Sequence, residues 1–433
     1  MKAFLLLAGL SKRFWPLTEK SLFPICGKTL LEIQIENLRA AGIQDIVFIG
    51  GKHNLDRAHA AYPDLPTVEQ KDLSLGMRGA LLDALPNIKE PAMIVGGNDV
   101  IEPAAYSALI REAQGKDANG ALLAKRMETY FPGGYLELSG ERIVSIVEKP
   151  GEGKEPSDLV TIVAHVHNDP QSLLEALKQT AKESNDDGYE RALATLFGSK
   201  IYHAVPYEGA WHPVKYPWHL LPLLQHELSL IKKPLIHPTA VVHPTAVIEG
   251  NVILEEGVRV FAHATVVGPC TIGKRSIVAN NALVRESSVG DDCVIGYSTE
   301  IKSSVLASHV WTHMTYIGDS IIGSNVSFGG GSLTGNLRLD EQEIASFVGK
   351  ESIATGLTKF GCVIGDGCRL GIRCALNPGM KIGKETFISG GVLIDQDVPD
   401  HRYVSMKGGE VVVRENRTSA PPPAARNVFK KAI

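Results

Sequence analysis

The sequence predicts two folded domains in one chain: a Rossmann-like α/β domain over about residues 1–230 and a left-handed parallel β-helix over about 236–405. Three observations predict this order. Short apolar runs alternate with helical spacing in the first half, and aliphatic residues recur every six positions in the second half. The length of 433 residues also exceeds what one compact core normally holds.

The first half alternates strand and helix patterns. Residues 3–7, 45–49 and 92–95 are short apolar runs, whereas 30–41 and 73–85 show helical spacing. This alternation predicts a parallel sheet with helices on both faces. Ligands of such sheets bind at the carboxyl ends of the strands, where Leu7 to Arg13 and Asp99 fall.

The second half repeats with a period of six. The aliphatic positions are Ile236, Val242, Ile248, Leu254, Val260, Val266, Ile272, Val278 and Val284, then Val289, Ile295 and Ile301, then Ile364, Leu370, Leu376, Ile382, Ile388 and Ile394. Residues four positions later in the first series are small or β-branched. Three hexads form one triangular coil, with the aliphatic residues stacked inward. The interruption between about 312 and 360 predicts an inserted loop, either a simple surface loop or a functional one.

Composition and charge exclude several classes. With 44 Lys and Arg against 48 Asp and Glu, the net charge of -4 does not suit a nucleic-acid-coating protein. We find no signal-peptide pattern and no apolar stretch of membrane-spanning length, so we expect a cytoplasmic protein that does not interact with membranes. Among the six cysteines, Cys368 and Cys374 stand one hexad apart, and we interpret them as small core residues in preference to a redox or metal pair. The proline-rich end, 418–433, is expected to be disordered.

Segments of the first half resemble sugar-phosphate nucleotidylyltransferases. Leu6 to Thr18 reads LLAGLSKRFWPLT, close to the family loop LAAGxGTRxxPLT, and Phe23 to Lys28 reads FPICGK. The resemblance implies a GT-A-like nucleotidyltransferase fold. It makes Arg13 and Lys20 the catalytic cations and Asp99 the Mg²⁺ ligand. It further assigns Gln70 and Gly76 to the base, and Gly134 and Glu148 to the sugar.

This half also departs from the family pattern. The second loop glycine is Ser11, the threonine after it is Lys12, and Met77 stands where the family has another threonine. The late metal-binding aspartate is replaced by Pro213, which has no side-chain oxygen for Mg²⁺.

Segments of the second half resemble the acetyltransferase domain of GlmU-type bifunctional enzymes, in their archaeal-style branch. Segments 299–304, 313–320, 336–340, 355–361 and 371–379 follow in the family order, with the branch's NLRxD at Asn336 to Asp340. The resemblance makes His313 the general base that takes a proton from the sugar amine, a task that suits imidazole. A lone histidine of this kind would more often be a surface residue, but the ordered set favours catalysis.

The same resemblance assigns the remaining site residues. Arg285 and Lys302 would bind phosphate, Tyr316 and Asn336 would orient the amino sugar, and Lys359 with Ala375 to Gly379 would lie near the acetyl-CoA thioester. Proteins of this family form homotrimers through the β-helix, which is therefore expected here.

Three functional hypotheses follow. The leading one is N-acetylation of an amino-sugar 1-phosphate by acetyl-CoA, coupled to Mg²⁺-dependent nucleotidyl transfer from UTP, as in UDP-N-acetylglucosamine synthesis. The second is a sugar-1-phosphate nucleotidylyltransferase that uses UTP or dTTP, with the β-helix serving only oligomerisation. The third is a non-catalytic protein that binds a nucleotide sugar.

Overall fold

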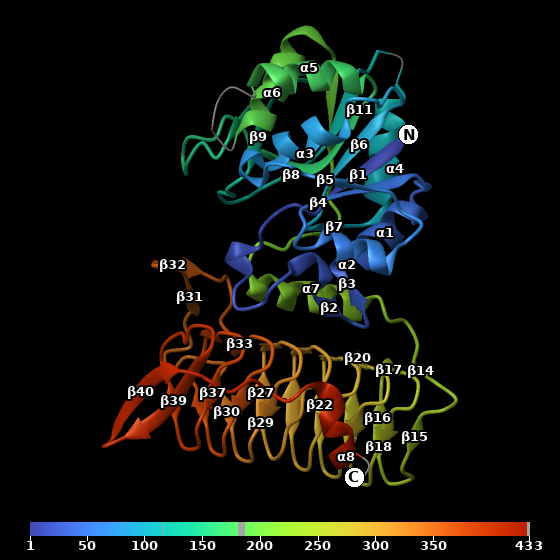
Figure 1. Ribbon diagram of the computed structural model, residues 1–433. Coiled ribbons are helices and arrows are strands. Elements are labelled where there is room, and N and C mark those ends of the chain that lie inside the picture. Colours follow the sequence, from blue (N-terminus) through green and yellow to red (C-terminus); the bar gives the residue numbers. More distant parts are fainter. Residues whose placement is uncertain (116, 181–186, 431–433) are drawn as a thin grey trace. The chain divides into compact units, whose positions relative to one another are not determined.

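The computed structural model describes residues 1–115, 117–180 and 187–430 (Figure 1). The chain forms two compact units, one of residues 1–10 and 30–213 and the other of residues 11–29 and 214–433. This division differs from the expected boundary near 230. Residues 11–29 and the helix that follows residue 214 group with the β-helix.

The first unit contains a nine-stranded sheet in the order β5-β4-β1-β6-β11-β8-β12-β10-β9. Its strands are β1 (Lys2–Leu6), β4 (Ile46–Gly50), β5 (Thr67–Glu69), β6 (Ala92–Gly96), β8 (Gly120–Arg126), β9 (Gly134–Ser139), β10 (Arg142–Glu148), β11 (Leu159–His167) and β12 (Tyr202–Pro206). The predicted parallel sheet is correct for β5, β4, β1 and β6. The other half is mixed, because β11 runs antiparallel to both its neighbours and β9 and β10 form a hairpin.

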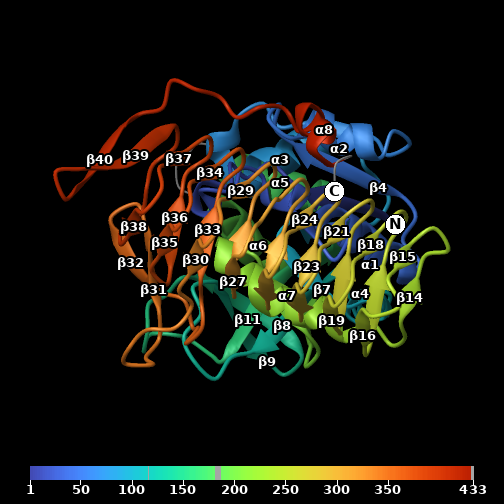
Figure 2. The ribbon, with the colours of Figure 1, turned by 90° about the horizontal axis from the view of Figure 1, so that it is seen from below.

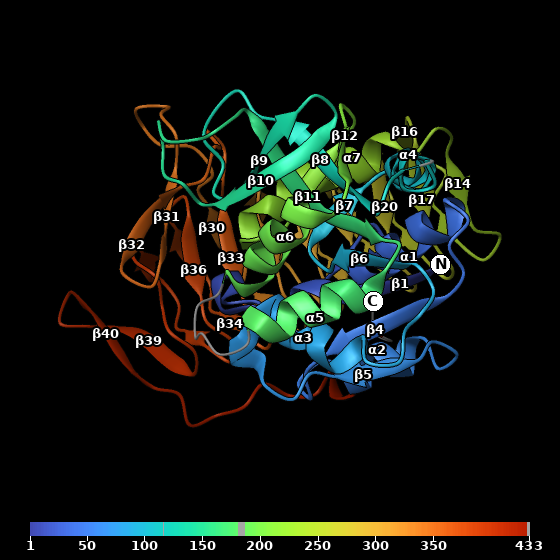
Figure 3. The same cartoon turned by 90° about the horizontal axis from the view of Figure 1, so that it is seen from above.

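Helices cover both faces of this sheet, as the alternation predicts. On one face α3 (Gly76–Ala84), α5 (Pro170–Thr180) and α6 (Gly188–Ser199) lie side by side (Figure 3). Their buried residues share one cluster with Phe4, Ile94 and Leu122 of the strands. Against the other face lies α4 (Pro103–Ala113), beside α1 (Leu30–Ala40), while α2 (Leu55–Ala61) packs on β4 and β5. A short ribbon of β7 (Asp99–Ile101) and β13 (Trp211–Pro213) completes the unit.

A buried polar network joins β11 to α6 and β12. His165 hydrogen-bonds the Tyr189 hydroxyl at 2.8 Å, and His167 hydrogen-bonds the Tyr202 hydroxyl at 2.9 Å. Both histidines are fully buried, and burial lowers the pKa of each to about 3. They are therefore neutral at every pH at which the protein is expected to work.

The second unit is a β-helix with three faces. The first face is β14-β17-β20-β23-β26-β28-β33-β36, and the third is β16-β19-β22-β25-β27-β30-β35-β38. The second face consists of β15-β18-β21-β24 and of β29-β34-β37-β39-β40, which are joined by bridges from Val294 to Trp311 and from Trp311 to Ser327.

The strands of the β-helix are short and follow in chain order. They are β14 (Leu235–Ile236), β15 (Val241–Val242), β16 (Val247–Glu249), β17 (Val252–Leu254), β18 (Arg259–Val260), β19 (Thr265–Val267), β20 (Cys270–Ile272), β21 (Ile277–Val278), β22 (Leu283–Arg285), β23 (Ser288–Val289), β24 (Val294–Ile295), β25 (Glu300–Lys302), β26 (Val305–Leu306), β27 (Tyr316–Gly318), β28 (Ile321–Ile322), β29 (Ser327–Phe328), β30 (Leu333–Thr334), β33 (Cys362–Ile364), β34 (Arg369–Leu370), β35 (Ala375–Leu376), β36 (Met380–Ile382), β37 (Phe387–Ile388), β38 (Leu393–Ile394), β39 (Arg402–Lys407) and β40 (Glu410–Glu415).

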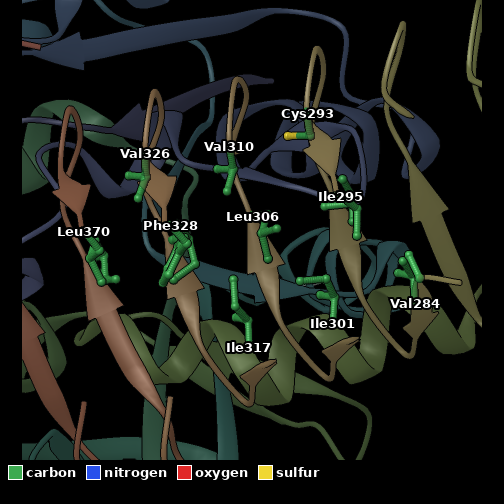
Figure 4. Packing of buried hydrophobic residues seen from close by; sticks show 14 of the residues in the cluster. Val284, Cys293, Ile295, Ile301, Leu306, Val310, Ile317, Val326, Phe328 and Leu370 are labelled. Carbon is green, nitrogen blue, oxygen red and sulfur yellow. The ribbon is translucent and has the colours of Figure 1, made fainter. Parts of the chain in front are cut away.

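The predicted aliphatic positions form the core of this unit. From Leu254 to Ile394 they are buried in one continuous cluster, and Figure 4 shows side chains of successive coils in rows. Ile236 pairs with Leu254, three hexads later, yet it is 47% exposed because no coil precedes it. Cys368 and Cys374 lie in the same cluster, and no group of three metal-binding side chains occurs in the described residues.

The outward residues of the first face are also buried. Thr271, Ser288, Val305, Ile321 and Val363 alternate with the inward positions but are at most 6% exposed. They are covered by α7 (Leu220–Ser229), which contacts β26, and by segment 11–29, in which the Cys26 amide donates a hydrogen bond to the Ser288 hydroxyl at 2.8 Å. Within that segment, β2 (Pro24–Ile25) pairs with β3 (Lys28–Thr29).

Two excursions leave the coils. The predicted insertion separates β30 from β33 and contains the hairpin of β31 (Ala345–Val348) and β32 (Glu351–Ala354). The tail is expected from its composition to be disordered. In the structure residues 418–430 run back along the coils and end in α8 (Asn427–Lys430) (Figure 2). Lys430 pairs with Asp292 at 2.9 Å, a contact between distant residues that proline content could not reveal. None of the helices in the described residues has the length and apolar character needed to span a membrane.

The buried histidines predict acid sensitivity of the first unit. Their folded pKa values of about 3 lie below the ordinary 6.5, so the unfolded chain binds more protons between these values. The contribution of the two histidines to the free energy of unfolding should be constant above pH 6.5. Between pH 6.5 and pH 3 this contribution should fall by roughly 1 kcal/mol for each histidine and each pH unit.

Denaturant unfolding between pH 5 and pH 8 measures this slope. A variant with both His165→Gln and His167→Gln should be less stable at pH 7.5 but should lose less stability on acidification. Exposed His59 provides the control, since His59→Gln should keep the wild-type slope. Equal slopes in all three proteins would contradict the prediction.

Candidate functional site

Two predicted phosphate-binding residues lie in register on the third face. Arg285 of β22 pairs with Lys302 of β25, which pairs with Gly318 of β27. Residues paired across neighbouring strands project to the same side. The β-helix therefore brings together two cations that are separated in the sequence.

Each of these cations is held by a carboxylate. Arg285 pairs with Glu300 at 2.7 Å, and Lys302 pairs with Asp319 at 3.1 Å. The hydrogen bond from the Arg285 side chain to Glu300 is the main cause that raises its pKa. Glu300 and Asp319 are not among the predicted site residues, although both lie in the segments that carry the resemblance.

Tyr316 and Asn336, which the resemblance assigns to the amino sugar, lie in the same cluster. The Asn336 side-chain amide donates hydrogen bonds to the Tyr316 hydroxyl at 3.1 Å and to Asp319 Oδ2 at 2.5 Å. Gly318 leaves the space for them, because a Cβ there would lie 2.4 Å from the Tyr316 hydroxyl oxygen. Burial raises the pKa of Tyr316, so its hydroxyl stays protonated and can donate a hydrogen bond.

His313 lies at the neighbouring corner, between the second and third faces. It is exposed, and its loop is fixed by a 3.0 Å hydrogen bond from the Thr315 hydroxyl to the His313 carbonyl. A groove of about 450 Å³ adjoins it, with walls that include Tyr297, Trp311 and Phe328. An exposed imidazole beside a partly apolar groove suits proton transfer from a bound substrate.

The predicted acetyl-CoA residues are spread over the next coils. Ala375 of β35 pairs with Leu333, which pairs with Tyr316. Ala375 therefore lies in register with Tyr316 on the third face, two coils farther along. Lys359 is exposed at the base of the insertion, where its backbone forms an isolated antiparallel β-bridge with Leu337. Gly379, with φ of +79°, packs against Ile344 of the insertion.

The first unit contains the predicted metal ligand. Asp99 begins β7 and is 8% exposed, and its Oδ1 accepts a hydrogen bond from the Trp211 indole at 2.9 Å. Pro213 lies directly opposite Asp99 in the β7–β13 ladder. The position facing the carboxylate therefore offers no second acidic side chain.

The predicted base- and sugar-binding residues lie in the same unit. Gln70 is 3% exposed, and its amide nitrogen donates to the Asp72 and Gly76 carbonyls at 2.8 and 2.9 Å. In this conformation its amide nitrogen orders the loop that ends at Gly76. Gly134 pairs directly with Glu148 across β9 and β10.

The predicted catalytic cations lie in the second unit. Arg13 and Lys20 belong to two short 3₁₀ turns, Lys12–Phe14 and Lys20–Leu22. Ser11 adopts φ of +49°, the left-handed conformation that a glycine adopts more easily. Buried Glu19 orders the loop, since its Oε1 accepts hydrogen bonds from the Ser21 hydroxyl at 2.8 Å and the Ser11 hydroxyl at 3.3 Å.

Trp15 attaches this loop to the last coils of the β-helix. Its indole nitrogen donates to Asp400 Oδ1 at 2.8 Å, and the Lys381 ammonium lies 5.4 Å from its ring centroid. Lys381 is itself buried, paired with Asp397 at 3.2 Å and hydrogen-bonded to the Phe347 carbonyl of the insertion. The buried Lys381 ammonium therefore contacts both the Arg13 loop, through Trp15, and the insertion that carries Asn336, through the Phe347 carbonyl.

Comparisons with known proteins agree with the family resemblances of both halves of the chain. Residues 2–213 match the nucleotidyl transferase family, and residues 230–330 match the GMPPB C-terminal domain. A bifunctional sugar-1-phosphate nucleotidylyltransferase/acetyltransferase of Sulfurisphaera tokodaii is 30% identical over 92% of this chain and 98% of its own. The bifunctional protein GlmU of Methanococcus vannielii is 28% identical over 96% of this chain and all of its own, and that of Methanocaldococcus jannaschii is 27% identical over the same shares.

The Trp15 attachment predicts the protease sensitivity of the Arg13 loop. Trp15→Ala removes a hydrogen bond and a cation–π contact, so tryptic cleavage after Lys12, Arg13 or Lys20 should become about tenfold faster. Trp15→Phe keeps the ring and should be intermediate. Cleavage after exposed Lys407 is the internal control. If the loop of Trp15→Ala is cleaved at the wild-type rate, Trp15 does not hold it.

Proposed function

Because the chain belongs to the family of bifunctional sugar-1-phosphate nucleotidylyltransferase/acetyltransferases, we propose that it completes a nucleotide sugar in two steps. The β-helix unit acetylates an amino-sugar 1-phosphate, with glucosamine 1-phosphate as first candidate and acetyl-CoA as donor. The acetylated sugar phosphate then takes a nucleotidyl group, with UTP as first candidate donor. The observation that carries the proposal is the cluster of Arg285, Lys302, Tyr316 and Asn336 beside His313.

In the acetyl-transfer step, the sugar amine attacks the thioester carbonyl carbon. A C–N bond forms, the C–S bond breaks, and coenzyme A leaves as the thiol. His313 takes the proton that the nitrogen must lose, because an imidazole is a competent base near neutral pH. Tyr316 and Asn336 orient the sugar hydroxyls by hydrogen bonds.

The sugar phosphate would bind at Arg285 and Lys302. The Arg285 side chain is 38% exposed while it remains paired with Glu300, so it can hold an additional anion without losing its partner. Lys359, Ala375 and Gly379 would contact the acetyl-CoA donor on the coils beyond Tyr316.

In the nucleotidyl step, an oxygen of the sugar phosphate attacks the α-phosphorus of the nucleoside triphosphate. A P–O bond forms and pyrophosphate leaves. Arg13 and Lys20 would balance the phosphate charge, and Gly134 and Glu148 would hold the sugar. Gln70 and Gly76 would bind the base, through the loop that the Gln70 amide orders.

The residues around Asp99 fit a magnesium ion that arrives with the triphosphate. Mg²⁺ is commonly bound by one or two carboxylates together with substrate phosphates and waters. Here Asp99 is one such carboxylate, and the facing position is Pro213. When bound, the ion would neutralise charge on the phosphates, and Asp99 would hold it.

Assembly and location complete the proposal. A homotrimer through the β-helix is expected from the resemblance to the acetyltransferase family. We place the protein in the cytoplasm, where acetyl-CoA and nucleoside triphosphates are available and where its six free cysteines stay reduced.

Replacement of the proposed base predicts loss of acetyl transfer. His313→Ala should lower kcat for thiol release from acetyl-CoA at least about 100-fold, because general-base catalysis is lost. Pyrophosphate release should stay unchanged. His243 is a matched control, since it is an exposed corner histidine of an early coil. Wild-type thiol release by His313→Ala would remove His313 from the mechanism.

Replacement of the proposed metal ligand predicts loss of nucleotidyl transfer. Asp99→Asn should lower pyrophosphate release by roughly 100-fold and leave thiol release intact, whereas Asp56→Asn on the exposed side of α2 should change neither. Pro213→Asp places a second carboxylate opposite Asp99 and should lower the Mg²⁺ concentration for half-maximal rate. Undiminished pyrophosphate release by Asp99→Asn would show that another group holds the ion.

A further inference from the structure

The last strand of the β-helix unit has an open edge. Among the described residues β40 is the final strand of its sheet and pairs only with β39. Figure 2 shows the β39–β40 hairpin standing out beyond the coils, with the tail leaving from its base. The tail turns at once to the coils, where the Asn416 side chain donates to the Glu385 carbonyl at 2.9 Å. The outer edge of β40 therefore remains uncovered.

This edge has a composition that monomeric proteins usually avoid. Its centre consists of Val411, Val412 and Val413, which are between 36% and 48% exposed although successive side chains point to opposite faces. Edge strands are commonly protected by a central charge, a proline or a bulge. In β40 the charged side chains stand only at the two ends of the strand. An open edge with exposed apolar side chains on both faces favours pairing with another strand.

The ladder between β39 and β40 shows which main-chain groups face outward. At the base of the hairpin the Asn416 amide donates to the His401 carbonyl at 2.9 Å, in the register of the two strands. Hydrogen-bonded and non-hydrogen-bonded pairs alternate along an antiparallel ladder. Even-numbered residues of β40 therefore bond to β39. Val411, Val413 and Glu415 direct their amides and carbonyls to the open edge.

A second β40 can pair antiparallel with this edge. The outward groups of two copies meet only when odd-numbered residues face odd-numbered residues, so a two-fold axis must pass through one residue of the strand. With the axis at Val412, Val411 of each copy faces Val413 of the other. Glu410 of each copy then faces Arg414 of the other.

Charge selects this register over its neighbours. In the two adjacent registers Arg414 lies opposite Gly408 or Val412, and Glu410 has no cation opposite it. Neither Glu410 nor Arg414 has an ion-pair partner within the described part of the chain, where the Arg414 guanidinium lies 4.6 Å from the Tyr403 ring centroid. Opposite charges and apolar side chains that face each other across two strands are favourable. The strand is therefore complementary to itself in charge, in apolar side chains and in main-chain hydrogen bonds.

We propose that β40 is a self-association surface that pairs antiparallel with β40 of a second copy of this chain, about a two-fold axis at Val412. The two hairpins then form one sheet in the order β39-β40-β40-β39, and neither β40 keeps an open edge. A two-fold contact joins chains in pairs, so single chains become dimers and trimers become hexamers. The contact does not depend on either proposed catalytic step.

Particle mass tests the contact. Sedimentation equilibrium of the wild type should give an even number of chains. Val413→Pro removes an outward amide but no hydrogen bond to β39, so it should halve the mass while the circular dichroism spectrum stays unchanged.

A charge exchange tests the side-chain pairing. Glu410→Arg places two cations opposite each other and should also halve the mass. The double variant Glu410→Arg/Arg414→Glu exchanges the two charges and should restore the wild-type mass. Glu415→Arg is the matched control, because it makes the same change of charge opposite Gly409 of the second copy and should keep the wild-type mass.

Engineered cysteines test the register. Val412→Cys places two thiols on the two-fold axis, in a non-hydrogen-bonded pair whose Cα atoms lie about 4.5 Å apart, within reach of a disulfide. Mild oxidation should convert most chains to a linked dimer on a non-reducing gel. Val411→Cys has Val413 opposite it and should give at least about tenfold less dimer. The wild type is a further control, because its cysteines are buried except Cys26.

Other outcomes would overturn the proposal. A wild-type particle with an odd number of chains would mean that the edge binds no second copy and is left for a different protein. An even number that neither Val413→Pro nor Glu410→Arg changes would mean that the copies meet elsewhere. Equal cross-linking of Val411→Cys and Val412→Cys would contradict the register.

Discussion

The stacking of aliphatic side chains inside the β-helix holds the second unit together and sets the positions of its outward side chains. From β14 to β38 its coils contain strands of two or three residues, too short to be stable alone, and each coil is held by the apolar contacts of the next. Because the inward positions repeat, the outward positions also line up at the spacing of strands in a sheet. The row of Arg285, Lys302 and Gly318 is a consequence of this constraint.

Segments from outside the repeat pack on the first face of the β-helix. Its outward residues are small or aliphatic from Thr271 to Val363, which allows α7 and segment 11–29 to pack on them. Trp15 and Lys381 then join the Arg13 loop to the last coils. Segments expected to serve nucleotidyl transfer and acetyl transfer therefore depend on one packed core.

The two outer faces that carry candidate sites differ in charge balance. On the third face each cation has its carboxylate, Glu300 for Arg285 and Asp319 for Lys302. On the second face Arg259 and Arg426 have no such partner in the described residues, and Arg426 is partly desolvated.

The β-helix and the strand and helix pattern of the first 100 residues could be predicted from local periodicity, which specifies the face on which each side chain projects. Arg285, Lys302, Tyr316 and Asn336 could be selected only through their resemblance to a family, because Tyr316 and Asn336 lie where the period is interrupted. Three-dimensional packing established that Asp319 links Lys302 to Asn336, that the Gln70 amide turns to its own loop, and that Trp15 reaches Asp400, 385 residues away. The tail seated on Asp292 belongs to the same class. Such contacts depend on which distant segments meet in space, and no local pattern of residues carries that information.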